Sequence, residues 1–142
     1  MAFILGDAWL ITMNERREVL DQASVYIEKD RIAAIGTLDG LRRSHPQAEV
    51  IDCSGCIVMP GMVNTHTHLF QTLLKGLGDD MVLKKWFTCM TLPAAQQFGA
   101  EDMYLAGLHG CVESIRSGVT TLVDFQYINF RPGMTEAVIR AF

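Results

Sequence analysis

Residues 60–68 read Pro60-Gly61-Met62-Val63-Asn64-Thr65-His66-Thr67-His68, a proline–glycine turn followed by a segment that predicts a β-strand. Alternate residues of a strand point to the same face, so we expect the imidazoles of His66 and His68 to point one way and Thr67 the other. Two such rings can each bring a nitrogen to within about 2.0–2.1 Å of one metal ion. The spacing therefore predicts half of a metal site, although an isolated pair of this kind more often bonds to backbone or water.

The most clearly predicted helix covers residues 101–117. Glu101 and Asp102 at its start suit the positive end of a helix dipole, and Gly118 directly after it suits a C-terminal cap. Apolar residues at spacings of three and four predict the buried face of this helix, and they are Tyr104, Leu108, Cys111 and Ile115, widened by Leu105 and Val112.

Parallel β/α units are the architecture that the surrounding sequence favours. Residues 69–77 predict a short helix, residues 83–90 another turn or two that Pro93 interrupts, residues 119–124 a buried strand, and residues 134–142 a last helix. Strand, helical connection, strand and helix in this order are typical of an α/β protein with a parallel sheet. In β/α barrels functional groups lie at the carboxyl ends of strands, which is where the histidine pair falls.

Residues 1–58 predict short strands of a half-buried antiparallel sheet. Apolar and polar residues alternate on both sides of a tight turn at residues 29–30. The polar stretch 42–47 is interpreted as a loop in which His45 is solvated. We therefore expect two domains, residues 1–58 and residues 59–142.

The four cysteines are too few and too scattered for a disulfide scaffold. Cys53 and Cys56 have the C-x-x-C spacing of a redox pair or half a zinc site, but Ser54-Gly55 between them suits the turn of a short hairpin joining residues 50–52 to residues 57–59. Because no second C-x-x-C pair follows, packing is favoured for these thiols over redox or metal chemistry.

Composition and charge exclude several classes of function. Lys and Arg number 12 against 16 Asp and Glu, a formal net charge of −4 without a basic run, which argues against nucleic acid or an anionic membrane as partner. With 49% hydrophobic residues the chain can form a core. No apolar run approaches the roughly 18 residues of a transmembrane helix. No positive charge precedes the first apolar run, so we expect a cytoplasmic protein without a secretory signal.

The motifs around the histidine pair closely resemble the amidohydrolase superfamily. Four motifs occur in the order in which the family has them. They are the histidine pair, the segment Leu73-Leu74-Lys75-Gly76-Leu77-Gly78-Asp79-Asp80, the pair Trp86-Phe87, and residues 113–124, which end in Ser117-Gly118-Val119-Thr120-Thr121-Leu122-Val123-Asp124. They look like the branch that contains cytosine, guanine, 8-oxoguanine and S-adenosylhomocysteine deaminases and the triazine chlorohydrolases. The resemblance spans essentially all 142 residues.

This resemblance implies a (β/α)₈ barrel, begun by residues 59–142, and a flanking β-sandwich, begun by residues 1–58. A full barrel takes about 250 residues, so we expect the N-terminal part of a longer enzyme. It also implies that His66 and His68 bind one divalent ion, Zn²⁺ first and Fe²⁺ or Mn²⁺ as alternatives, while later histidines and an aspartate complete the site. The implied activity is deamination or dechlorination of a small nitrogen heterocycle by metal-activated water. Homo-oligomers are expected of the full-length protein.

Gln71 and Trp86 are the candidate residues for substrate binding. The amide of Gln71 can both donate and accept hydrogen bonds with a heterocycle, and some relatives use this neighbourhood for substrate contact; the alternative is an ordinary surface glutamine. Trp86 can form an apolar wall for a planar ring, and packing against the top of the barrel is the alternative for this side chain. Asp124 is more simply explained by a strand-end hydrogen bond than by catalysis, and His109 by a pairing with Glu113 at i,i+4.

Two other functions stay open on the sequence. A chain with two of four or five ligands can be a catalytically silent fragment that docks to a complementary chain through unpaired strand edges. The enzymatic alternative is a hydantoinase-like or dihydroorotase-like cyclic amidase. Asn64 stands where those relatives commonly have Asp, which favours the deaminase branch.

Overall fold

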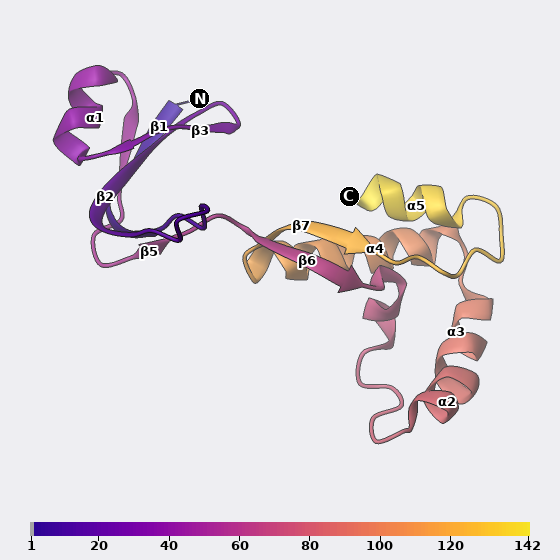
Figure 1. The fold of residues 1–142 in the computed structure, drawn as a ribbon. Helices are drawn as coiled ribbons and strands as arrows, with labels where there is room; N and C mark the ends of the chain where they lie inside the picture. Colours follow the sequence, from indigo (N-terminus) through magenta and orange to yellow (C-terminus); the bar gives the residue numbers. More distant parts are fainter. Residues whose placement is uncertain (1) are drawn as a thin grey trace. The chain divides into compact units, whose positions relative to one another are not determined.

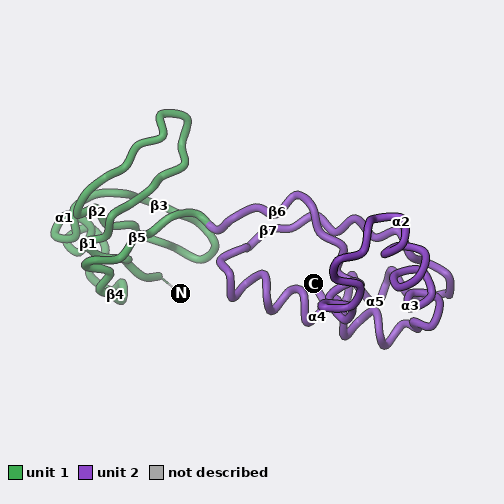
Figure 2. The backbone as a smooth tube through the Cα atoms, turned by 90° about the horizontal axis from the view of Figure 1, so that it is seen from below, with its two compact units in different colours: residues 1–60 green, residues 61–142 purple. Residues whose placement is uncertain are grey.

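The computed structural model of the protein describes residues 2–142. The described chain forms two compact units, whose boundary lies between Pro60 and Gly61 (Figure 2). The first unit contains β1 (Ala2–Ile11), β2 (Val19–Glu28), β3 (Arg31–Gly36), α1 (Leu38–Ser44), β4 (Glu49–Asp52) and β5 (Ile57–Val58). The second contains β6 (Met62–Thr67), the 3₁₀ helix η1 (Leu69–Leu74), α2 (Leu83–Trp86), the π-helical turn η2 (Phe87–Thr91), α3 (Leu92–Gln97), α4 (Ala100–Arg116), β7 (Val119–Asp124) and α5 (Met134–Ala141) (Figure 1).

The first unit is built on a sheet in which β1 has the most partners. The strand order is β3-β2-β1-β4, and β5 also pairs with β1. The predicted antiparallel pairing around residues 29–30 is confirmed, because Glu28 of β2 lies opposite Arg31 of β3. Ile4, Tyr26 and Leu41 form the buried cluster on one side of this sheet.

The predicted hairpin between residues 50–52 and 57–59 is wrong. Both β4 and β5 run parallel to β1 and pair with successive parts of it, at Phe3–Gly6 and at Trp9–Leu10. The turn between them does form, since the Asp52 carboxylate accepts the backbone N–H of Ser54 at 2.9 Å. This turn shifts the chain sideways without reversing its direction. Both β4 and β5 therefore pair with β1 and do not pair with each other.

The polar stretch 42–47 was also misassigned as a loop, because α1 extends to Ser44. The Thr37 side chain accepts the backbone N–H of Gly40 and caps the helix, and Leu41 anchors it in the core. His45 at its end stacks on Tyr26 with ring centroids 3.7 Å apart, so it is a packed side chain.

In the second unit β6 and β7 form a parallel pair, and the connection between them contains α4 (Figure 1). The limits of β7 match the predicted strand 119–124, but this strand is not buried: Val123 is 53% exposed. The reason is that, among the described residues, β7 has β6 as its one strand neighbour. Pro93 does not interrupt the helical run 83–97: it is the second residue of α3, which follows the π-helical turn η2 without a break.

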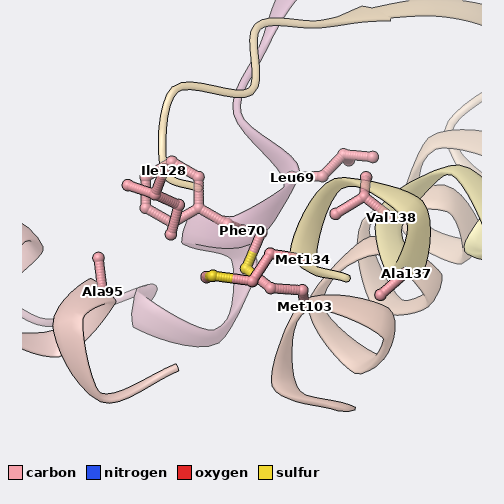
Figure 3. Packing of buried hydrophobic residues seen from close by; sticks show 8 residues of the cluster. All are labelled: Leu69, Phe70, Ala95, Met103, Ile128, Met134, Ala137 and Val138. Carbon is pink, nitrogen blue, oxygen red and sulfur yellow. The ribbon is translucent and has the colours of Figure 1, made fainter. Parts of the chain in front are cut away.

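The boundaries of α4 were predicted well and its buried face in part, since Tyr104 and Cys111 of the predicted stripe are partly buried against the core. The buried residues are Met103, Ala106, Gly107 and Gly110, whereas Leu108 and Ile115 of the predicted stripe are 39% and 70% exposed. The buried face of α4 needs small residues because α5 approaches it closely: a Cβ added at Gly107 would lie only 2.9 Å from Cβ of Ala141. The core beside this face is shown in Figure 3 and comprises Leu69, Phe70, Ala95, Met103, Ile128, Met134, Ala137 and Val138.

Among residues 2–142, no helix combines the length and the apolar character needed to cross a membrane.

Candidate metal and ligand site

The two histidines at the carboxyl end of β6 face each other. Their Nε2 atoms lie 3.2 Å apart, and their rings meet edge to face at 87° with centroids separated by 5.0 Å. The expectation that both imidazoles point to the same place is therefore confirmed.

A bulge in β6 contributes to this convergence. Asn64 pairs with Leu122 and Thr67 with Asp124, so three steps on β6 match two on β7. The extra residue falls in the segment that contains His66. The Asn64 side-chain oxygen accepts a hydrogen bond from the His66 backbone N–H at 3.1 Å. This bond gives the N–H a partner at the bulge, where the regular strand pairing is interrupted. Bulges of this kind commonly re-aim side chains next to active sites.

The neighbouring strand sets the tautomer of His68. Its Nδ1 lies 2.8 Å from the backbone carbonyl oxygen of Phe125. A carbonyl oxygen can only accept, so Nδ1 carries a hydrogen; in the neutral form of the ring, the lone pair is then on Nε2, which faces His66. Histidines that bind metals commonly donate their other N–H in this way.

These two nitrogens fit a divalent metal ion. Two ligands about 2.0–2.1 Å from a tetrahedral zinc lie roughly 3.3–3.4 Å from each other, and the two Nε2 atoms are 3.2 Å apart. Within residues 2–142, no group of three or more His, Cys, Asp or Glu side chains is arranged to hold a metal. The described residues thus offer a two-nitrogen half-site at the position that the sequence indicated.

The end of β7 fastens the segment that carries the pair. The Asp124 carboxylate accepts the backbone N–H of Leu69 at 2.9 Å, and the N–H of Phe125 donates to the carbonyl of Thr67 at 2.8 Å. These bonds bracket His68 on both sides. Asp124 thus makes the strand-end hydrogen bond that the sequence favoured. Burial raises the pKa of its carboxyl above the ordinary value, while the bond from Leu69 and the nearby His68 act in the opposite direction.

An open cavity of about 970 Å³ adjoins the histidines. Both candidate substrate residues line it together with His66 and His68: Gln71 comes from η1, and Trp86 ends α2. Trp86 lies close over the loop before α2, because a Cβ added at Gly78 would come within 2.9 Å of its indole.

Gln71 is held by a residue that the sequence did not single out. Its Nε2 donates to the Tyr127 hydroxyl at 2.5 Å. The Tyr127 ring meets His68 edge to face with centroids 5.1 Å apart, and Phe125 does the same at 5.7 Å. Burial raises the pKa of Tyr127, while the hydrogen bond from Gln71 acts in the opposite direction. The signal available in the sequence was an aromatic pair directly after a strand, on the same edge as the histidines.

The predicted pairing of His109 with Glu113 is present on the surface of α4. The His109 Nδ1 lies 3.7 Å from the carboxylate, which also pairs with the Lys75 ammonium. The hydrogen bond from Lys75 lowers the pKa of Glu113. His109 thus faces an anion that already has a partner.

All four cysteines are free thiols. Cys53 is buried, and burial raises the pKa of its thiol. A raised pKa disfavours the reactive thiolate, so the environment of Cys53 agrees with the packing role favoured above, whereas Cys56 is exposed and does not.

Two sequence profiles match the chain. One, described as the Amidohydrolase family, covers residues 57–142, and one, described as an imidazolonepropionase-like composite domain of bacteria, covers residues 25–48. The chain is 38% identical over 125 residues to a 5-methylthioadenosine/S-adenosylhomocysteine deaminase of Nitratidesulfovibrio vulgaris (strain DP4). It is 38% identical over 124 residues to a 5'-deoxyadenosine deaminase of Methanosarcina mazei. These alignments include 88% and 87% of this chain and 28% of each relative.

Solved structures share this fold. A mutant of atrazine chlorohydrolase from Arthrobacter aurescens TC1, complexed with zinc and atraton, aligns with a TM-score of 0.86 at 24% identity over 98% of this chain and 32% of that protein. Guanine deaminase of E. coli aligns with a TM-score of 0.74 at 20% identity over 99% of this chain and 33% of that one. The chain therefore spans about a third or less of the length of the proteins that it matches.

Proposed function

Because this chain belongs to the amidohydrolase family, we propose that its protein is a metal-dependent hydrolase that acts on a nitrogen heterocycle. The observation that carries the proposal is the convergence of the His66 and His68 Nε2 atoms, 3.2 Å apart at the end of β6. The relatives named above are deaminases, and one structural neighbour is a chlorohydrolase. The proposed reaction replaces an amino group or a chloride on a ring carbon by the oxygen of water, and releases ammonia or chloride.

We propose zinc as the ion, because imidazole nitrogens suit it and the chlorohydrolase neighbour was obtained as a zinc complex. The chemistry that the ion supplies when bound is the activation of water at neutral pH. The chain's own residues hold the two nitrogens in place. Phe125 keeps the hydrogen of His68 on Nδ1, and Asp124 fixes the backbone directly after that ring.

The ring substrate is proposed to occupy the cavity beside the pair. Gln71 brings hydrogen-bonding groups to it, and Trp86 brings an apolar surface on which a planar ring can lie.

For the architecture, we propose that β6, α4, β7 and α5 are the first two β/α units of a (β/α)₈ barrel, and that residues 1–58 are part of a β-sandwich. The parallel pairing of β6 with β7 and the position of the histidines at a carboxyl strand end support the barrel. The TM-score of 0.86 with the chlorohydrolase supports both parts.

Two imidazoles provide two of the four ligands usual for zinc. We therefore propose that the remaining ligands and the proton-transferring group come from protein segments other than these residues. Residues 1–142, expressed alone, should bind zinc weakly and show no turnover. Tight stoichiometric zinc together with turnover by this chain alone would contradict that proposal.

The test of the proposed function is a turnover assay with the protein expressed from its complete gene. Zinc-loaded protein is incubated with 5'-deoxyadenosine, S-adenosylhomocysteine, guanine and atrazine, and released ammonia or chloride is measured. We expect turnover of at least one ring, its loss after chelation and dialysis, and its return with zinc. Full activity of protein shown to be free of metal would contradict the metal dependence, and no turnover of any ring would contradict the substrate class.

A further inference from the structure

Gln71 has two neighbours of different kinds. It lines the cavity beside the histidine pair, and its amide nitrogen donates to the Tyr127 hydroxyl at 2.5 Å. A glutamine side chain that had only the cavity around it would sample several rotamers, and ordering it for a ligand would cost entropy. The contact with Tyr127 removes part of that freedom before any ligand arrives.

Tyr127 is itself held firmly enough to act as a support. Its ring meets Phe70, which is 0% exposed, edge to face with centroids 4.9 Å apart, and it meets His68 at 5.1 Å. The next residue, Ile128, is 2% exposed in the core, and the Gln126 amide donates to its carbonyl at 2.9 Å. The hydroxyl therefore lies at a defined distance from both the histidine pair and Gln71.

We propose that Tyr127 is a positioning residue that orients the Gln71 amide toward a ring edge carrying a hydrogen-bond donor beside an acceptor. This inference rests on the proposed function and specifies its substrate class. With one N–H given to Tyr127, Gln71 retains its oxygen and a second N–H for the ligand. An amino group next to a ring nitrogen offers the matching pair, which is the pattern that glutamine reads on adenine.

The hydroxyl can be removed without disturbing the ring. Phe at position 127 keeps the contacts with Phe70 and His68 and loses only the bond to Gln71. Tyr104 provides the matched control, because it belongs to the same unit and its ring lies under Arg140, with the guanidinium carbon 4.6 Å from the ring centroid.

The test is a double-mutant cycle on the zinc-loaded protein expressed from its complete gene. Tyr127→Phe, Gln71→Ala, the double variant and Tyr104→Phe are compared by zinc content and by kcat and KM with 5'-deoxyadenosine, S-adenosylhomocysteine and guanine. We expect Tyr127→Phe to raise KM about threefold to tenfold, as for loss of one hydrogen bond, with kcat and zinc content unchanged. In the Gln71→Ala background the same substitution should change KM by less than about twofold, because Tyr127 acts through Gln71. Tyr104→Phe should match the wild type.

Two other outcomes would contradict the inference, and they differ in what they mean for the proposed function. An active wild type in which the two substitutions raise KM additively, or in which Tyr127→Phe lowers kcat or zinc content instead, overturns this inference and leaves the proposed function standing. A wild type that turns over none of the rings overturns the proposed function and the inference with it.

Discussion

The end of β6 and the surface of α4 both carry histidine, but they give it opposite surroundings. On β6 the partner of His68 is a backbone carbonyl, which fixes the hydrogen on Nδ1 and leaves Nε2 facing the Nε2 of His66. On α4 the partner of His109 is the carboxylate of Glu113, which also pairs with Lys75. A neutral acceptor behind the His68 ring leaves a lone pair of Nε2 free for a cation, whereas the His109 ring lies beside a carboxylate that already pairs with the Lys75 ammonium. The surroundings, more than the residue type, thus distinguish a candidate ligand from a surface histidine.

The strongest test of this difference is to remove each histidine in turn. His66→Ala or His68→Ala should abolish tight zinc binding and lower turnover by more than the roughly 10–100-fold that loss of an outer-shell partner costs. His109→Ala should retain both, because its ring faces an ion pair on the helix surface. Zinc content and kcat/KM of the protein expressed from its complete gene provide the measurement. Equal losses in all three variants would show that the two regions do not differ.

Asp124 tests whether the β6 site depends on its backbone support. Asp124→Ala leaves the Leu69 N–H without its acceptor and should lower the free energy of unfolding by about 1–3 kcal/mol. Asp124→Asn keeps an oxygen in place and should retain most of the stability. Urea denaturation of both variants gives the comparison, and an Asn variant as unstable as the Ala variant would show that the charge matters more than the hydrogen bond.

Gly110 connects the two regions, since it follows His109 in sequence and contacts Leu69, the neighbour of His68. A Cβ at this position would lie 2.5 Å from Cδ2 of Leu69 and 2.9 Å from Cγ2 of Thr72. Overpacking of this kind costs about 1–3 kcal/mol, and the higher helix propensity of Ala offsets part of it, so Gly110→Ala should destabilise by about 1–2 kcal/mol. Gly36→Ala is the control, because its nearest contact would be 3.8 Å from Leu41. A lower unfolding temperature for Gly36→Ala than for Gly110→Ala would contradict this account of the packing.

The smallest expected effect concerns pH and the α4 region. Lys75 lowers the pKa of Glu113 in the folded protein. The resulting stabilisation is present above the carboxyl's unfolded pKa and is lost as the pH falls through the folded one. Lys75→Gln should therefore lose less stability than the wild type between about pH 6 and pH 3. The difference should shrink in about 1 M salt because the pair is exposed. Denaturation series at the two pH values, with and without salt, measure it.

Local signals in the sequence predicted what depends on neighbouring residues. The limits of α4 followed from its acidic first turn and from Gly118, whose φ of +85° is the left-handed conformation of a C-terminal cap. The shared direction of His66 and His68 was predicted from the alternation of side chains along a strand, but the bulge in β6 that contributes to it was not. Family membership followed from several motifs kept in one order.

Features that depend on distant parts of the chain could not be predicted in this way. The parallel pairing of β4 and β5 with β1 requires knowledge of a partner some 45 residues away. The most buried part of the α4 face was not predicted, because small residues, which carry little hydrophobic signal, lie where other elements approach most closely. The contact of Gln71 with Tyr127 joins residues 56 positions apart, and no periodicity reports it.

The central claim is that His66 and His68 together hold one divalent ion. An anomalous-difference map, recorded at the zinc absorption edge from crystals of the zinc-loaded protein expressed from its complete gene, tests it most directly. We predict one peak within about 2.0–2.1 Å of both Nε2 atoms, with the Nδ1 of His68 still bonded to the Phe125 carbonyl. A peak at Cys53 and Cys56, or beside His109 and Glu113, with the two rings at the end of β6 turned away from each other, would contradict the account.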